Sequence, residues 1–186
     1  MDGTLNGWGP VRQVAYVTRD MQRSLSHYVE ALGVGPWFST EQAVIDRCRY
    51  RGAPCAMNLT AALAYWGSIQ VELLQQNNDA PSVFLDWGAG SQAREIHHHV
   101  AYWVDDYTEA IKSAERRGFS VVQDGLSAWG PFAYLLHPDA PHGFIEFTAS
   151  TPERRAFQAA IAAAAADWRG ERPYRSFANA VDGESA

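Results

Sequence analysis

The chain has 186 residues, of which 47% are hydrophobic and 19% are charged, a balance typical of a globular protein that buries a core. Its net charge of −6 argues against nucleic acid or an anionic membrane surface as the main partner. With only two cysteines, no signal-peptide pattern and no apolar run of about 20 residues, the sequence predicts a cytoplasmic protein without a disulfide scaffold or membrane span.

The first half of the chain is predicted to form a βαβββ module over residues 11–75, after an irregular lead-in over residues 1–10. Its first strand is expected at residues 11–17. Asp20 is predicted to cap a helix over residues 21–32. The inward residues of this helix, chosen by helical spacing, are Met21, Leu25, Tyr28, Val29 and Leu32. Three further strands are expected, at residues 43–50, 56–66 and 68–74.

A polar connector over residues 76–96, expected to hold a short helical turn, leads to a second βαβββ module over residues 97–149. A strand at residues 97–104 and a helix at 107–117, with Ala110, Ile111 and Ala114 inward, open this module. Its remaining strands are expected at residues 120–123, 132–136 and 143–148.

The end of the chain is predicted to form one more helix. Thr151-Pro152-Glu153 combines a cap, a proline at the first helical position and an acid in the first turn. The helix is expected within residues 150–170, followed by a polar tail over residues 171–186 in which Tyr174 and Phe177 are candidate anchors.

The two modules repeat a sequence phrase and its polar residues. Gln13-Val-Ala-Tyr in the first matches His99-Val-Ala-Tyr in the second, and Glu72 and Glu146 each lie in an apolar closing strand. Two such modules related by a pseudo-twofold axis would direct one nitrogen or oxygen donor and one carboxylate from each half toward a shared cleft.

One imidazole, two carboxylates and one amide oxygen form a mixed donor set. This set suits a divalent ion of intermediate hardness, namely Zn²⁺, Ni²⁺, Co²⁺, Mn²⁺ or Fe²⁺, and it would leave positions open for water or substrate. A single Glu in an apolar strand usually faces solvent, but the paired occurrence of Glu72 and Glu146 with Gln13 and His99 favours a metal site. By strand alternation, His97 shares the face of His99 and could line the mouth of the cleft, whereas His98 points away.

Several other side chains are candidates for the walls of the cleft. The aromatic residues are plentiful, although core packing explains each of them equally well; they are Trp37, Trp66, Trp103, Trp129, Phe132 and Tyr134. Arg49 and Arg51 could bind a carboxylate or phosphate, and His137 and His142 could carry protons, but exposed or turn positions would also explain them. Together the aromatic residues predict a roomy cavity for a small molecule of apolar or aromatic character.

The chain resembles the vicinal oxygen chelate superfamily, which includes glyoxalase I, methylmalonyl-CoA epimerase, fosfomycin and bleomycin resistance proteins and extradiol dioxygenases. The resemblance covers residues 11–149 and rests on five segments: Gln13-Val-Ala-Tyr with Asp20, Leu32-Gly-Val-Gly-Pro36, Val71-Glu72-Leu73, His98-His99-Val-Ala-Tyr-Trp-Val-Asp-Asp and Ile145-Glu146-Phe147. It implies an α+β fold in which the two modules form a curved, partly open mixed sheet around a metal cleft, and it implies a homodimer.

The resemblance maps the family's metal ligands onto Gln13, Glu72, His99 and Glu146. This order is similar to that of some glyoxalase I enzymes, whereas the second-half motif is more similar to the epimerase-like group. The implied function is therefore that of a metal-dependent isomerase, epimerase or lyase that removes a proton next to a carbonyl through a metal-stabilised enolate. By the same resemblance Glu146 is the first candidate base and Glu72 the second.

Two other functions remain open on the same scaffold. One is a non-catalytic binding or sequestering protein of the resistance-protein type, with an apolar cavity and no metal. The other is an Fe(II) ring-cleaving dioxygenase, which needs two histidines and one carboxylate where this chain offers Gln13 and Glu72 in place of possible histidines.

Overall fold

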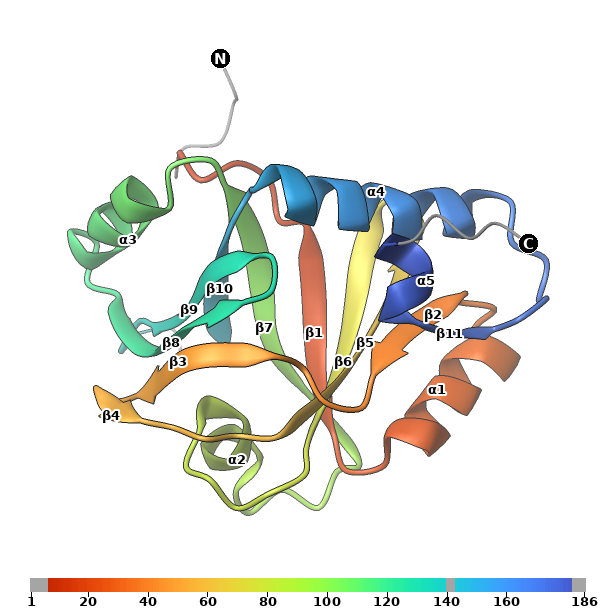
Figure 1. Ribbon diagram of the computed structural model, residues 1–186. Helices are drawn as coiled ribbons and strands as arrows, with labels where there is room; N and C mark the ends of the chain where they lie inside the picture. Colours follow the sequence, from red (N-terminus) through yellow and green to blue (C-terminus); the bar gives the residue numbers. More distant parts are fainter. Residues whose placement is uncertain (1–6, 140–142, 182–186) are drawn as a thin grey trace.

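The computed structural model describes residues 7–139 and 143–181. Its strands form one 11-stranded sheet, and helices lie around it (Figure 1). The strand order is β11-β2-β5-β6-β1-β7-β10-β9-β8-β3-β4. Residues 1–6 of the predicted lead-in, His142 and the last five residues of the predicted tail lie outside the described residues. Within the described residues no helix is long and apolar enough to cross a membrane.

The sheet consists of two similar halves that meet at β1 (Gln13–Thr18) and β7 (Glu95–Val104). The first half continues outward through β6 (Ile69–Gln76), β5 (Leu59–Trp66) and β2 (Trp37–Thr40). The second half continues through β10 (Phe144–Ala149), β9 (Gly130–Leu136) and β8 (Ser120–Ser127). Each central strand pairs in parallel with its own closing strand, and β1 and β7 run antiparallel to each other. This arrangement confirms the predicted fold class.

The prediction was wrong about which strand completes the first half. The strand expected at residues 43–50 exists as β3 (Ile45–Tyr50), but β3 pairs with β8 of the second half and with the short β4 (Ala53–Pro54). The fourth strand of the first half is β2, which pairs with β5 and which the sequence analysis did not predict. A strand of four residues carries little periodicity, and strand partners far apart in sequence depend on tertiary contacts.

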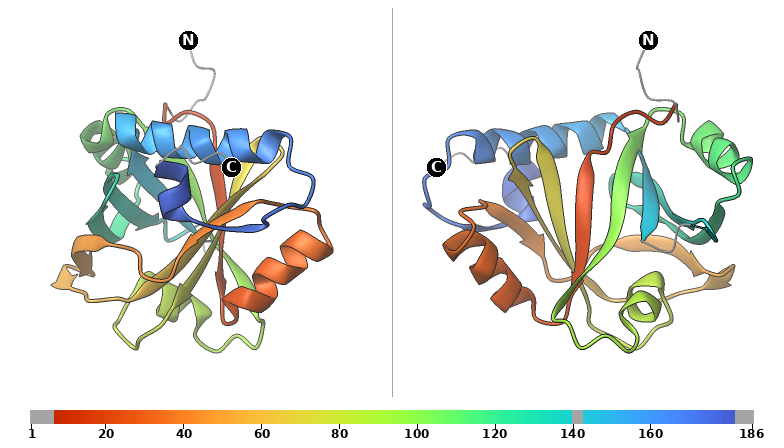
Figure 2. Two further views of the ribbon diagram at one scale, coloured as in Figure 1. Left: turned by 45° about the vertical axis from the view of Figure 1, so that its right-hand side comes forward. Right: turned by 180° about the vertical axis from the view of Figure 1, so that it is seen from behind.

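The helices of the two halves pack on the same outer face of the sheet, as the views in Figure 2 indicate. Helix α1 (Met21–Glu30) is capped by Asp20, and α3 (Tyr107–Glu115) by Asp106, through side chains that accept from backbone N–H groups. Tyr28 of α1 is buried as predicted. Leu32, which was predicted to face inward, lies beyond the helix and is 40% exposed.

The connector between the halves holds the predicted helical turn as α2 (Val83–Gly88), which Ser82 caps. Val83 and Phe84 are fully buried, and they anchor α2 against the inner face of the sheet. The predicted C-terminal helix is α4 (Pro152–Ala166), with Thr151 as its cap.

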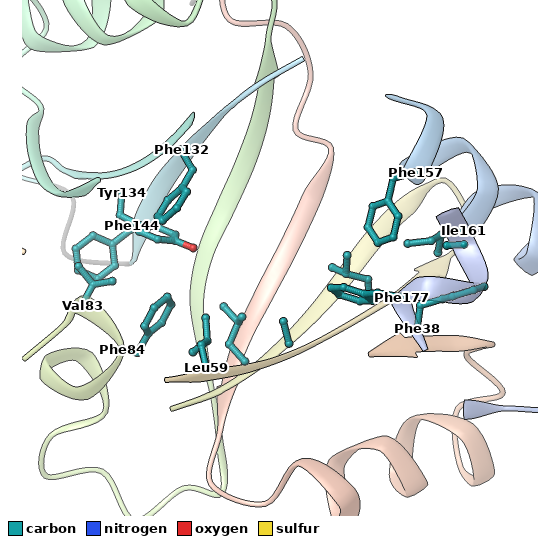
Figure 3. Packing of buried hydrophobic residues seen from close by; sticks show 14 of the residues in the cluster. Phe38, Leu59, Val83, Phe84, Phe132, Tyr134, Phe144, Phe157, Ile161 and Phe177 are labelled. Atoms are coloured by element: carbon teal, nitrogen blue, oxygen red, sulfur yellow. The ribbon is translucent and has the colours of Figure 1, made fainter. Parts of the chain in front are cut away.

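The tail beyond α4 forms part of the fold. Residues of β11 (Tyr174–Ser176) pair with β2, and α5 (Phe177–Val181) follows directly. Of the two residues predicted to anchor the tail, Phe177 is buried, whereas Tyr174 is 49% exposed. Figure 3 shows Phe177 beside Phe157 of α4 on one side of the inner face, while Phe84, Phe132 and Phe144 gather on the other side.

Candidate functional site

Two neighbouring rows of side chains on the inner face of the sheet bring the predicted metal ligands together. In one row Ala15 lies opposite Glu72 on β6 and opposite His99 on β7. In the other row Ala101 lies opposite Gln13 on β1 and opposite Glu146 on β10. The rows are two residues apart along each strand, so their side chains point to the same face.

The centre of each row is an alanine with no exposed surface. Ala15 and Ala101 occupy equivalent positions in the two halves. Because their side chains end at Cβ, they leave room above the sheet in which the longer side chains of the flanking strands can approach one another. The Val-Ala-Tyr phrase shared by the halves therefore has a geometric role at the site.

Glu72, His99 and Glu146, here called the trio, form a compact group with one ligand atom from each residue within 4.8 Å of the others. Nε2 of His99 lies 3.1 Å from Oε2 of Glu146 and 3.4 Å from Oε2 of Glu72. His99 has no exposed surface, and its Nε2 makes no hydrogen bond of good geometry. A buried imidazole nitrogen left in this way between two carboxylates fits a divalent metal ion, for which all three atoms are suitable ligands.

The charged side chains of the trio shift one another's pKa values. Burial lowers the pKa of His99, but the negative charges of Glu146 and Glu72 outweigh this effect and raise the pKa to about 9. Burial raises the pKa of Glu72, and the charge of Glu146 adds to that shift while His99 opposes it. Without a metal ion, the trio therefore holds a proton on His99 at neutral pH.

His98 orients His99, contrary to the prediction that it points away. The pairing of β1 with β7 shifts its register so that Ala15 faces His99 and Tyr16 faces His97, which leaves His98 as an extra residue. Such a bulge changes the alternation of side chains and turns His98 toward the inner face, where its ring contacts Phe84 and Phe144. The same change places His97 against Tyr16 rather than at the mouth of the cleft.

The hydrogen bonds of His98 determine which ring nitrogen of a neutral His99 carries the proton and which one has a free lone pair. Nε2 of His98 lies 3.4 Å from the carbonyl oxygen of Val83, which can only accept. Burial lowers the pKa of His98 well below its ordinary value, so the ring is neutral and its Nδ1 is an acceptor. Nδ1 of His99, 2.8 Å away, must then donate, and Nε2 of a neutral His99 is left free to bind a metal ion.

A cavity of about 270 Å³ opens beside the trio, and residues from both halves of the sheet line it. Gln13, Glu72 and Glu146 line it, and Gln13 is 4% exposed. Its apolar walls come from β5, β9, α2, α4 and α5 and include Leu59, Leu63, Phe84, Phe132, Phe157 and Phe177. Strands from opposite ends of the sheet reach one cavity only because the sheet curves around it.

The predicted wall residues divide into two groups. Trp129 and Tyr134 line the cavity, and the Trp129 ring stacks on Phe157 with centroids 4.3 Å apart. Trp103 and Arg49 do not line it: Trp103 lies near Arg12, and Arg49 pairs with Asp124 at the far edge of the second half.

The remaining predicted wall and proton-carrying residues lie elsewhere in the fold. Trp37 is fully buried in the core next to α1, and Trp66 is 52% exposed. Arg51 pairs with Asp86 of α2. His137 contacts the carbonyl oxygen of Arg117.

The predicted site did not include several polar residues that line the cavity, among them Gln70, Thr148, Arg154 and Gln158. Gln70 lies two residues before Glu72, and Thr148 two residues after Glu146, so strand alternation could have found both. No comparable signal marks Arg154, because it lies on α4 outside the repeat. Burial lowers the pKa of Arg154, and the nearby charges of Glu146 and Glu72 act in the opposite direction.

Among solved structures, the fold is similar to that of selenomethionine methylmalonyl-CoA epimerase, with 21% identity and a TM-score of 0.51 over 76% of this chain and 94% of that chain. It is also similar to methylmalonyl-CoA epimerase from Mycobacterium tuberculosis, with 14% identity and a TM-score of 0.53 over 78% of this chain and 91% of that chain. A mutant of 4-hydroxymandelate synthase from Streptomyces coelicolor gives 15% identity and a TM-score of 0.50 over 76% of this chain and 48% of that chain. At these identities the similarity shows the fold alone.

Comparison with curated protein sequences gave no match. A sequence model described as the glyoxalase/bleomycin resistance protein/dioxygenase superfamily matches residues 12–133. This segment includes both central strands and the trio residues Glu72 and His99, and it covers more than half of the chain. The chain therefore belongs to the glyoxalase/bleomycin resistance protein/dioxygenase superfamily.

Proposed function

We propose that this protein is a divalent-metal-dependent isomerase, epimerase or lyase that removes a proton from a carbon next to a carbonyl group. The observation that carries the proposal is the buried Nε2 of His99, which faces two carboxylates beside a largely apolar cavity and makes no hydrogen bond. Glu72, His99 and Glu146 would hold the ion, and the amide oxygen of Gln13 is the proposed fourth ligand.

A divalent ion held by these residues would supply Lewis-acid polarisation of a carbonyl oxygen and stabilise negative charge that develops on it. The protein's own residues supply the proton transfer. Glu146 and Glu72 both line the cavity, so either carboxylate can reach a bound molecule. Glu146 is the proposed base and Glu72 the second candidate. The walls of the cavity are largely apolar, and apolar surroundings strengthen the electrostatic interactions of both carboxylates.

The first experiment measures the metal content of the purified, untagged protein and of two variants, His99→Ala and Glu146→Ala. We expect about one divalent ion per chain in the wild type and a large loss in both variants, because each change removes a ligand of the trio. His27→Ala is the matched control, since His27 is an exposed histidine on α1. A wild type that retains no metal after reloading would contradict the proposal.

Proton removal is then tested by deuterium exchange. The metal-loaded protein is incubated in D₂O with a panel of enolisable carbonyl compounds, and NMR follows loss of the proton next to the carbonyl. Glu146→Gln should slow exchange by roughly 10²–10⁴-fold, which is the usual contribution of a positioned base. Oxygen uptake by the iron-loaded protein with the same panel would instead favour a dioxygenase.

A second candidate function is non-catalytic binding of a small apolar molecule. The cavity with aromatic walls favours it, because such cavities bind ligands by burying apolar surface. This function predicts tight ligand binding by the metal-free protein and no proton exchange with any member of the panel.

A further inference from the structure

One end of the cavity, beneath α4, contains a buried cation that the proposed proton transfer does not use. Arg154 lies in the first turn of α4, lines the cavity and is 8% exposed. Its Nε donates to the carbonyl oxygen of Ala149 at 2.9 Å, and its Nη2 donates to Oγ of Ser127 at 3.2 Å. Both acceptors are neutral, and in the described part of the chain Arg154 forms no ion pair. A buried guanidinium without a direct counter-ion is costly.

Two unpartnered polar atoms lie in the wall of the same cavity. Oε1 of Gln70 and Oγ1 of Thr148 are buried and have no hydrogen-bond partner. Gln70 has no exposed surface, and its Nε2 is held by Oε1 of Gln158, which lies one turn after Arg154 on α4. Buried polar atoms normally make hydrogen bonds, so this end of the cavity is suited to a polar ligand group. The Thr148 hydroxyl can donate to such a group, whereas Oε1 of Gln70 can only accept.

The charges around the cavity determine the sign of that group. Glu72 and Glu146 contribute −2 and Arg154 contributes +1, since these are the charged side chains that line the cavity. A divalent ion at the trio adds +2, so the loaded cavity has a net charge of +1 when His99 is neutral. In largely apolar surroundings an uncompensated charge is unfavourable, and a monoanion would neutralise it.

We propose that Arg154 and the hydroxyl of Thr148 form a carboxylate-binding subsite and that the substrate is an amphiphilic monocarboxylate. Its carboxylate would bind at Arg154, its carbonyl at the trio and its apolar or aromatic body against the wall that includes Phe132 and Trp129. The position of the carbonyl and the net charge of the loaded cavity rest on the proposed function, whereas the contacts of the subsite come from residues of this chain. Arginine suits the task because its planar fork donates to both oxygens of a carboxylate.

The test compares a charged probe with a neutral probe of the same shape. 3-Phenylpropanoate and 3-phenylpropanamide, with benzoate and hexanoate as further carboxylates, are titrated by calorimetry into zinc-loaded and metal-free protein. We expect the wild type to prefer the carboxylate to the amide by roughly 10- to 100-fold, the usual effect of a hydrogen bond to a charged group. Arg154→Met should remove this preference.

Three further variants separate binding from folding. Arg155→Met is the matched control, since Arg155 is the exposed neighbour on α4, and it should keep the preference. Arg154→Lys keeps the charge and should keep part of the preference. Thr148→Val removes one hydroxyl at nearly constant volume and should weaken carboxylate binding several-fold, which tests the subsite even if Arg154→Met does not fold.

The outcomes distinguish this proposal from the proposed function. If no carboxylate binds, or if Arg154→Met retains the preference and Thr148→Val has no effect, the subsite is wrong, whatever the metal content. If the protein retains no metal but its carboxylate preference depends on Arg154, the subsite stands and only the metal-dependent function is overturned.

Discussion

At the scale of single residues, the site depends on two small side chains in the central strands and on one bulge. The alanines at the centre of the two rows leave space above the sheet, and the bulge at His98 turns an extra imidazole inward. Together these features place His99 in a fixed orientation with Nε2 toward two carboxylates. The hydrogen bond between His98 and His99 is the contact that selects the tautomer.

Replacing His98 should weaken metal binding without removing a ligand. In His98→Phe the ring volume is nearly kept, but Nδ1 of His99 loses its hydrogen-bond partner. We expect the affinity for Zn²⁺ to fall roughly 10- to 100-fold, as it does for lost partners of metal-bound histidines. Competition with a chelator measures it. His97→Phe, next in sequence but facing Tyr16, should bind like the wild type. Equal affinities of His98→Phe and the wild type would contradict this role.

The metal-free protein should lose stability as the pH rises. The pKa of His99 is about 9 in the folded state, against an ordinary value near 6.5 when unfolded. Its contribution is therefore fully present below about pH 6.5 and is lost as the pH rises through about 9. Urea unfolding at pH 6, 7.5 and 9 measures this slope. His99→Gln should flatten it, and a slope that persists in that variant would contradict the assignment.

At the scale of elements, the helices after the repeat complete the cavity. Thr151 caps α4 by accepting from the N–H of Arg154, and its hydroxyl also donates to the carbonyl oxygen of Trp129. This one side chain therefore connects the start of α4 to the loop before β9. Phe157 and Phe177 then cover the inner face from α4 and α5, as Figure 3 shows.

Removing the cap of α4 should affect both stability and the cavity. Thr151→Ala is expected to lower the free energy of unfolding by about 1–2 kcal/mol, the usual loss for such caps. Because Arg154 lies in the turn that the cap begins, binding of 3-phenylpropanoate should weaken as well. Asp106→Ala removes the equivalent cap of α3, away from the cavity, and should cost similar stability without changing binding. Unchanged binding in Thr151→Ala would show that the cap does not position Arg154.

At the scale of the whole molecule, the two halves are joined in more than one place. β1 and β7 pair at the centre, and β3, which comes from the first half, pairs with β8 at the edge of the second (Figure 1). The largest core cluster contains residues of both halves and of α4 and α5. The halves are therefore repeats in sequence that share the largest core cluster, while each half also has a smaller cluster beneath its own helix.

A shared core predicts a single cooperative unfolding transition. In differential scanning calorimetry of the metal-free protein, the calorimetric and van't Hoff enthalpies should agree. Phe177→Ala should lower the free energy of unfolding by about 3–5 kcal/mol, since it empties a buried aromatic position. It should also leave one transition. Two separate transitions in either protein would show that the halves fold independently.

The sequence determined the repeat, the central strands, the capped helices and the identity of the trio. These features depend on local patterns: alternation in strands, helical spacing, cap residues and a phrase that occurs twice. The shared Val-Ala-Tyr phrase placed His99 at the position equivalent to Gln13, and the two apolar closing strands placed Glu146 at the position equivalent to Glu72. Pseudo-symmetric halves bring such equivalent positions together.

Only the tertiary structure decided the remaining features of the site. The inward turn of His98 depends on a bulge that arises when β7 pairs with β1, and the partner of β3 lies about 80 residues away, at β8. Arg154 enters the cavity because α4 packs across both halves, a contact that no local pattern encodes. Local sequence specifies which faces are apolar, whereas the pairing of distant segments depends on which arrangement buries those faces together.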